Sequence, residues 1–268
     1  MSGYLRIFYN VLTGAEDLKK QIDLMAGVLI GVSPIIHLII VSGINAPYGR
    51  YTSSSWGLPI NSKLAWFLQE LPAFLIPVFS YFTMTSSNVS TPALILLSVF
   101  LLHYFNRTFI YSQKIRGGKP TPILIFLMAM FFCICNGYMQ SVFLLQISNY
   151  REEYLFEWNF VVGLILFFLG MYINLECDSI LRNLRKEGEK GYKIPTGNMF
   201  NYVTGGNLFG ESLEWCGWGL ACWSIQGFAF ATFAVMYLSA RSYSHHVWYL
   251  KKFEDYPKDR KIFIPYIV

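Results

Sequence analysis

The sequence predicts an all-α integral membrane protein with seven transmembrane helices, an outer or lumenal N-terminus and a cytosolic C-terminus. Three observations support this. Hydrophobic residues form 54% of the 268 residues and charged residues only 14%, whereas soluble domains carry about 25% charged residues. Several apolar runs of about 20 residues are long enough to cross a bilayer as helices. Basic residues gather in alternate loops, which the positive-inside rule assigns to the cytosol.

The expected spans follow the apolar runs in order. Five cover residues 24–44, 64–83, 91–111, 122–146 and 158–181. A polar stretch over 182–208 precedes an apolar region over 209–250, which is too long for one span. A break at Ser-Ile-Gln-Gly, residues 224–227, divides that region into two helices. The first 23 residues lack the apolar core and cleavage site of a signal peptide, so the first span is expected to be retained.

Positive charge favours seven spans over six. With seven, the loops 45–63, 112–121 and 182–208 and the C-terminal segment 241–268 share one side and hold most of the lysines and arginines. Six spans would put the basic C-terminal segment on the opposite side. The whole chain, 1–268, is expected to be one membrane domain and a monomer. The expected location is the endoplasmic reticulum membrane in a eukaryote or the inner membrane in a bacterium.

Several functional classes find no support. The five cysteines are odd in number and form no C-x-x-C pair, so they are expected as small buried hydrophobic side chains rather than disulfides. No metal site is expected, because adjacent His245 and His246 would point about 100° apart on a helix. Nothing indicates a nucleic-acid partner.

Glu70 is the acidic residue that needs an explanation. It lies in an apolar run that begins at Trp66 and continues to Phe82, and no other acidic residue occurs between Asp23 and Glu152. A charge at the bilayer centre costs roughly 3 kcal/mol or more. Such a residue within a span usually faces the protein interior and marks a functional site. Glu70 therefore predicts a catalytic or binding group.

Four further segments carry polar residues at helical spacing near the cytosolic ends of the spans. Arginine suits phosphate groups, and Asn, Asp and Glu suit ribose hydroxyls and amides. The combination indicates a dinucleotide pocket open to the cytosol. Interfacial charges beside an aromatic belt are the alternative. The four sets are Tyr104, Arg107 and Tyr111; Asn174, Asp178 and Arg185; Asn207, Glu211 and Glu214; and Arg241, His245 and Tyr249.

Glycine-rich stretches add little to this hypothesis. The run Gly-Gly-Asn-Leu-Phe-Gly at 205–210 lacks the G-x-G-x-x-G spacing of a Rossmann fold and follows no predicted strand. It is expected to be a turn before a helix. The loop from Arg116 to Lys119 is basic, and phosphate contact there stays open.

These residues also carry a resemblance. The chain resembles the steroid 5α-reductases (3-oxo-5α-steroid 4-dehydrogenases) from about residue 46 to the C-terminus. The matching segments include APYGRY at 46–51, WFLQELP at 66–72 and HYFNRTFIY at 103–111, then residues 174–185, 202–214 and 249–258. The resemblance implies seven membrane helices with NADPH bound from the cytosol, and makes 46–268 the catalytic region and 1–45 an N-terminal segment with the first span.

The resemblance also implies roles for single residues. Glu70 and Tyr104 would hold the substrate ketone, with Gln69 beside the nicotinamide. The other cofactor contacts would be Arg107, Tyr111, Arg116, Asn174, Asp178, Arg185, Asn207, Glu211, Arg241, His245 and Tyr249. Ile115 departs from the asparagine of mammalian members, the Arg116–Lys119 loop has an extra glycine, and the fourth span lacks an arginine that some relatives carry.

The implied reaction is the NADPH-dependent reduction of the 4,5 double bond of 3-oxo-Δ4-steroids. Hydride would attack the enone β-carbon while Tyr104 and Glu70 donate hydrogen bonds to the ketone oxygen. Glu70 can donate only when protonated, which burial in an apolar span favours. Reduction of another lipid, such as a trans-2-enoyl-CoA or a polyprenol, and a non-catalytic lipid-binding protein are the alternatives.

Overall fold

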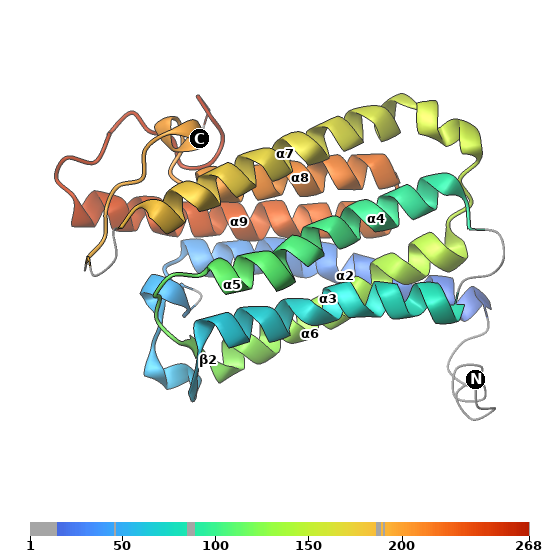
Figure 1. The fold of residues 1–268 in the computed structure, drawn as a ribbon, viewed down its shortest axis with the longest axis horizontal. Coiled ribbons are helices and arrows are strands. Elements are labelled where there is room, and N and C mark those ends of the chain that lie inside the picture. The colour runs from blue at the N-terminus through green and yellow to red at the C-terminus, as the bar shows by residue number, and fades with distance from the viewer. Residues whose placement is uncertain (1–14, 46, 85–88, 186–188, 190, 268) are drawn as a thin grey trace.

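The computed structural model describes residues 15–45, 47–84, 89–185, 189 and 191–267 as a bundle of long helices (Figure 1). α2(Ala15–Val41), α3(Ser62–Met84), α7(Trp158–Asn183), α8(Gly206–Cys222) and α9(Ile225–Lys252) are single helices. α4(Thr91–Phe105) continues through η3(Asn106–Tyr111) into α5(Ser112–Lys114), and α6(Ile123–Val142) continues into η4(Phe143–Ile147). Seven long helical segments are thus present within the described residues.

Five of these helices are long and apolar enough to cross a membrane. They lie over Leu18–Val41, Ser62–Thr83, Thr91–Lys114, Ile123–Ile147 and Trp158–Asn183. These match the first five expected spans and support a multi-pass membrane protein. α8 and α9 do not meet the combined requirement of length and apolar composition for a membrane span. Polar side chains such as Glu214 and Arg241 lower their hydropathy, although both of these side chains are buried inside the protein.

Helix ends differ from the expected spans at two places. α2 begins at Ala15 rather than 24, because Leu18 and Ile22 pack in a small apolar core with Met139 and Ala229. The break between the last two helices falls at Trp223, slightly before the expected 224–227. Trp223 has a positive φ of 46° and ends α8. Ser224 then caps α9 by accepting a hydrogen bond from the Gly227 N–H.

Short elements join the helices at the end of the bundle where the C-terminal segment lies (Figure 1). β1(Pro59–Ile60) and β2(Thr121–Pro122) form an antiparallel pair that ties the α2–α3 connection to the start of α6. No strand was expected there. The short helices η1(Gly49–Tyr51), η2(Ser54–Trp56) and η6(Asn198–Asn201) belong to this end, whereas η5(Glu152–Phe156) joins η4 to α7 at the opposite end.

α7 and α8 pack so closely that their backbones touch, because glycines face each other across the interface. A Cβ on Gly170 would lie 2.6 Å from the Gly210 carbonyl oxygen, and a Cβ on Gly163 would lie 2.6 Å from the Gly217 carbonyl oxygen. The two pairs define an antiparallel register: Gly163 and Gly170 follow each other along α7, while their partners Gly217 and Gly210 run in the reverse order along α8. This register places the polar C-terminal part of α7 beside the N-terminal turns of α8.

Candidate functional site

Glu70 on α3 and Tyr104 on α4 meet at one face of α6. Cys133 Sγ donates to Glu70 Oε2 at 3.7 Å, and Asn136 Nδ2 donates to the Tyr104 hydroxyl at 3.4 Å. Residues three apart share one side of a helix, so one side of α6 reaches both groups. Gln69 Nε2 donates to Glu70 Oε1 at 3.4 Å. We call these five residues the inner cluster; all except half-buried Glu70 are buried.

A second group, the Arg107 network, joins three helices. Arg107 Nη1 lies 3.4 Å from Asp178 Oδ2, and its Nη2 lies 3.8 Å from Glu211 Oε2. Asn207 Nδ2 donates to Asp178 Oδ1 at 3.0 Å, and Asn174 Nδ2 donates to the Asn207 carbonyl at 2.9 Å. The α7–α8 register therefore brings five predicted cofactor residues into one network.

Arg107 also connects this network to the inner cluster. Its guanidinium lies 4.3 Å from the centroid of the Tyr111 ring and 5.0 Å from that of Trp66. Trp66 is one turn before Glu70 on α3. A regular helix was expected over Tyr104, Arg107 and Tyr111, whereas residues 106–111 form a π-helical turn. Such turns are frequent at functional sites, and this one still directs Arg107 and Tyr111 toward each other.

A third group, the Arg241 cluster, lies between the α2–α3 connection and α9. Arg241 is stacked 4.2 Å from the Tyr48 ring and 5.3 Å from that of Tyr51. The Tyr51 hydroxyl lies 3.1 Å from His245 Nδ1, and the two rings stack. Burial raises the pKa of Tyr51, although nearby Arg50 and Arg241 act in the opposite direction, so its hydroxyl stays neutral at neutral pH.

Arg50 extends the Arg241 cluster toward the α7–α8 connection. Its guanidinium lies 4.4 Å from the Trp248 ring, 4.8 Å from Tyr249 and 5.3 Å from Tyr192. Its Nη2 donates to the Tyr249 hydroxyl at 3.4 Å, while its Nη1 is buried without a hydrogen-bond partner among the described residues. Aromatic rings attract a guanidinium without neutralising its charge. The site therefore offers buried positive charge to an anion.

Two predicted cofactor residues lie at the edge of these groups. Arg185 is 5.9 Å from the Tyr192 ring, on which Arg50 also stacks, and its Nη1 donates to the Gly191 carbonyl at 3.2 Å. Arg116 is exposed, and its Nη1 donates to Asn183 Oδ1 at 3.2 Å. This hydrogen bond ties Arg116 to the C-terminal end of α7 rather than to the Arg107 network or the Arg241 cluster.

Comparison with known proteins identifies the family. A sequence model of 3-oxo-5-alpha-steroid 4-dehydrogenase matches residues 119–268. The chain is 48% identical over 224 residues to 3-oxo-5-alpha-steroid 4-dehydrogenase 1 of Homo sapiens, covering 83% of this chain and 86% of that protein. This chain belongs to the 3-oxo-5-alpha-steroid 4-dehydrogenase family. It is also 47% identical over 232 residues to 3-oxo-5-alpha-steroid 4-dehydrogenase 2 of Rattus norvegicus, covering 86% and 91% of the two chains.

Membership in the 3-oxo-5-alpha-steroid 4-dehydrogenase family confirms the resemblance found in the sequence and makes the chain an oxidoreductase. Several residues of the site were nevertheless not expected from the sequence. Tyr48, Arg50 and Tyr51 occur in the APYGRY segment that carried the resemblance, so a signal existed. Cys133 and Asn136 had none, because an isolated polar residue in an apolar run does not reveal its partner on another helix.

The sequence also did not predict a buried pair between His103 and Glu214. His103 Nδ1 lies 2.7 Å from Glu214 Oε1, and both side chains are at most 5% exposed. His103 precedes Tyr104 on α4, and its ring lies 4.4 Å from that of Trp215. The pair joins α4 to α8 directly beside the inner cluster and thereby contributes to its rigidity.

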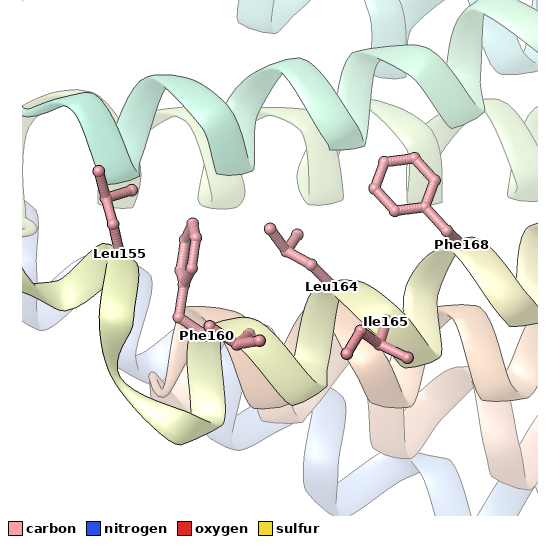
Figure 2. Close-up of a pocket in the computed structure, with 6 residues that line it drawn as sticks. Leu155, Phe160, Leu164, Ile165 and Phe168 are labelled. Carbon is pink, nitrogen blue, oxygen red and sulfur yellow. The ribbon is translucent and has the colours of Figure 1, made fainter.

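The described residues line two recesses, one apart from the three groups and one beside the Arg107 network. The first, of about 510 Å³, is lined by apolar side chains of η5 and α7, including Leu155, Leu164 and Phe168 (Figure 2). It shares no residue with the three groups and offers no polar group for chemistry. The second, of about 350 Å³, lies between the η3–α5 region and α7 and includes Tyr111 and Asp178. The Arg107 network therefore opens onto a polar recess.

Proposed function

We propose that this chain reduces the 4,5 double bond of 3-oxo-Δ4-steroids with NADPH, forming 5α-steroids. One observation carries the proposal: the inner cluster, with its carboxyl and phenol, adjoins the Arg107 network inside an apolar bundle. The relatives' names describe a dehydrogenase acting on 3-oxo-5-alpha-steroids at position 4. An apolar bundle with a few convergent polar groups suits a ligand that is apolar except for one ketone.

The residues of the site fit NADPH. Arg50, Arg185 and Arg241 supply positive charge for its phosphates, and the unpaired Nη1 of Arg50 offers a donor, since no described residue accepts from it. Side chains of the Arg107 network provide donors and acceptors for ribose hydroxyls and the carboxamide. His245 and Tyr249 add further polar contacts from α9. When bound, the cofactor supplies the hydride for the β-carbon of the enone.

The chain's own contribution is to stabilise the negative charge that develops on the ketone oxygen. Tyr104 donates a hydrogen bond through its phenolic hydroxyl, and Glu70 donates one as a protonated carboxyl group. The proton that completes the reduction at the α-carbon comes from solvent. Donors held in place before the reaction are worth about 3 kcal/mol each in the transition state. Gln69 adjoins Glu70 and is in a position to orient both the carboxyl group and the nicotinamide.

The proposed orientation has seven spans, a lumenal or outer N-terminus and a cytosolic C-terminus. α8 and the part of α9 before the cytosolic segment 241–268 would be the sixth and seventh spans, with their polar side chains turned into the bundle. The described start of α2 and the C-terminal segment lie at opposite ends of the bundle (Figure 1), which an odd number of spans requires. The Arg241 cluster lies near the C-terminal end, where NADPH of the cytosol has access.

The decisive experiment is NADPH oxidation by the purified protein on addition of a 3-oxo-Δ4-steroid, with the product identified by mass spectrometry. Glu70→Gln is expected to bind NADPH but lose most turnover, because an amide is a weaker donor than a carboxylic acid. Glu153→Gln, at an exposed glutamate of η5, is the control. Unimpaired kcat in Glu70→Gln would remove Glu70 from the mechanism, and no steroid-dependent NADPH oxidation in the wild type would refute the proposed function.

A further inference from the structure

A chain of buried side chains leads from Tyr104 through α6 to α9. Asn136 Nδ2 donates to the Tyr104 hydroxyl at 3.4 Å, and Gln140 Nε2 donates to Asn136 Oδ1 at 3.0 Å. Gln140 Nε2 also donates to the backbone carbonyl of Gln226 at 3.0 Å. Tyr104, Asn136, Gln140 and Gln226 are all at most 3% exposed. Asn136 and Gln140 are one turn apart on α6, so they form a continuous polar stripe.

The Gln226 carbonyl sets the direction of every hydrogen bond in this chain. A carbonyl can only accept, so the Gln140 atom facing it must be the amide nitrogen. The Asn136 atom facing that nitrogen must then be the oxygen, which leaves the Asn136 nitrogen toward Tyr104. An amide nitrogen only donates, so the phenol oxygen accepts. The phenolic hydrogen consequently remains for an acceptor elsewhere, such as the ketone of the proposed substrate.

The observed orientation of the Gln140 amide leaves one of its atoms unsatisfied, but the reversed orientation would be less favourable. Gln140 Oε1 is buried without a hydrogen-bond partner among the described residues. A buried polar atom without a partner is unfavourable. Turning the Gln140 amide over would instead place its oxygen against the Gln226 carbonyl, so two acceptors would face each other. The α9 backbone therefore keeps the chain in its donating direction.

We propose that Asn136 and Gln140 are positioning residues that hold the Tyr104 hydroxyl as a hydrogen-bond donor to the substrate ketone. The inference rests on the proposed function through the role of Tyr104. Hydrogen bonds running in one direction polarise one another. Donation from Asn136 makes the phenol a stronger donor as negative charge develops on the ketone oxygen. The 3.4 Å bond from Asn136 to the Tyr104 hydroxyl is expected to shorten as that charge develops.

α2 supports the far end of this hydrogen-bond chain. Gln226 Nε2 donates to Asp23 Oδ1 of α2 at 2.7 Å. The contact fixes the first turn of α9 against α2, and with it the Gln226 carbonyl that directs Gln140. α2 lies in the N-terminal segment for which the sequence offered no role beyond adding a span. We assign it a part in orienting Tyr104.

The test is a double-mutant cycle on the full-length enzyme. Asn136→Leu and Gln140→Met each break the hydrogen-bond chain while keeping a side chain of similar volume. Each is expected to lower kcat about 10-fold, the loss of one hydrogen bond, with NADPH binding unchanged. In a Tyr104→Phe background the same changes are expected to lower kcat by less than about twofold, because the group they position is already absent. Ser141→Ala is the matched control, a buried hydroxyl on α6 bonded to the Gly137 carbonyl outside the chain.

The outcomes are separable. Wild-type kcat in Tyr104→Phe would refute the proposed role of Tyr104 itself. A strongly impaired Tyr104→Phe together with wild-type kcat in both Asn136→Leu and Gln140→Met would overturn the positioning role alone. A further 10-fold loss from either change in the Tyr104→Phe background would also overturn it, since that loss would not act through Tyr104. NADPH binding, followed by quenching of tryptophan fluorescence, reports that each variant is folded.

Discussion

Replacing Gly170 with alanine is expected to separate α7 from α8 and weaken cofactor binding, although Gly170 belongs to none of the three groups. A Cβ at this position would lie 2.6 Å from the Gly210 carbonyl oxygen and 2.7 Å from Glu214 Cα, and it would also clash with the Glu214 nitrogen. These distances are roughly 1 Å short of an ordinary contact, and all three atoms belong to backbone that cannot turn away.

The expected magnitude follows from that geometry. Overfilling a well-packed interface costs about 1–3 kcal/mol, and contact with backbone on a rigid helix points to the upper part of that range. The displaced α8 carries Asn207 and Glu211 of the Arg107 network, whose bonds to Asp178 and Arg107 would lengthen. The KM for NADPH should therefore rise together with the loss of stability.

Gly31→Ala provides the matched control. Gly31 is also inside a long apolar helix, but apart from its own helical turns no described atom lies within 4 Å of the position that a Cβ would take there. Alanine has a helix propensity about 1 kcal/mol better than glycine, so this variant should be as stable as the wild type or more so. The assays are the thermal midpoint of the detergent-solubilised enzyme and the KM for NADPH. Equal midpoints and equal KM values in Gly170→Ala and Gly31→Ala would refute the reasoning.

Three further predictions concern charge, capping and pH. Arg107→Met leaves the buried Asp178 and the half-buried Glu211 without their cation. It should destabilise the protein by about 3–5 kcal/mol and raise the KM for NADPH; exposed Arg151→Met is the control, and equal thermal midpoints would contradict the ion-pair assignment. Ser224→Ala removes the cap of α9 and should cost about 1 kcal/mol in thermal unfolding; an unchanged midpoint would show that the cap is redundant. Burial, with a smaller contribution from Arg260, lowers the pKa of His246 in the C-terminal segment 241–268. The contribution of neutral His246 to the free energy of unfolding should therefore be fully present above about pH 6.5, the unfolded pKa. It should decrease as the pH falls toward the folded pKa. His246→Asn should lose less stability over that interval in pH-dependent melting, and identical profiles would contradict a role for His246.

The sequence alone determined which segments become helices. Apolar runs of membrane length must bury their backbone polar groups in helices, and the observed bounds of α3, α6 and α7 lie close to the expected ones. The sequence also identified Glu70 as an unusual residue and revealed the polar stripes, because side chains on one face of a helix follow from spacing alone. Residue spacing does not reveal which helices are neighbours, however. Nothing in the sequence indicated that Cys133 contacts Glu70 or that His103 pairs with Glu214.

Only the tertiary structure decided which polar groups meet and in which direction their hydrogen bonds run. The α7–α8 glycine contacts set the register that joins Asp178 to Asn207, and Arg107, in the π-helical turn, faces Asp178 and Glu211. The polarity of the chain at Tyr104 depends on one backbone carbonyl, that of Gln226, on a helix far away in sequence. A periodic pattern specifies the face of a single helix, whereas a site requires contacts between helices, and those depend on packing across the whole bundle.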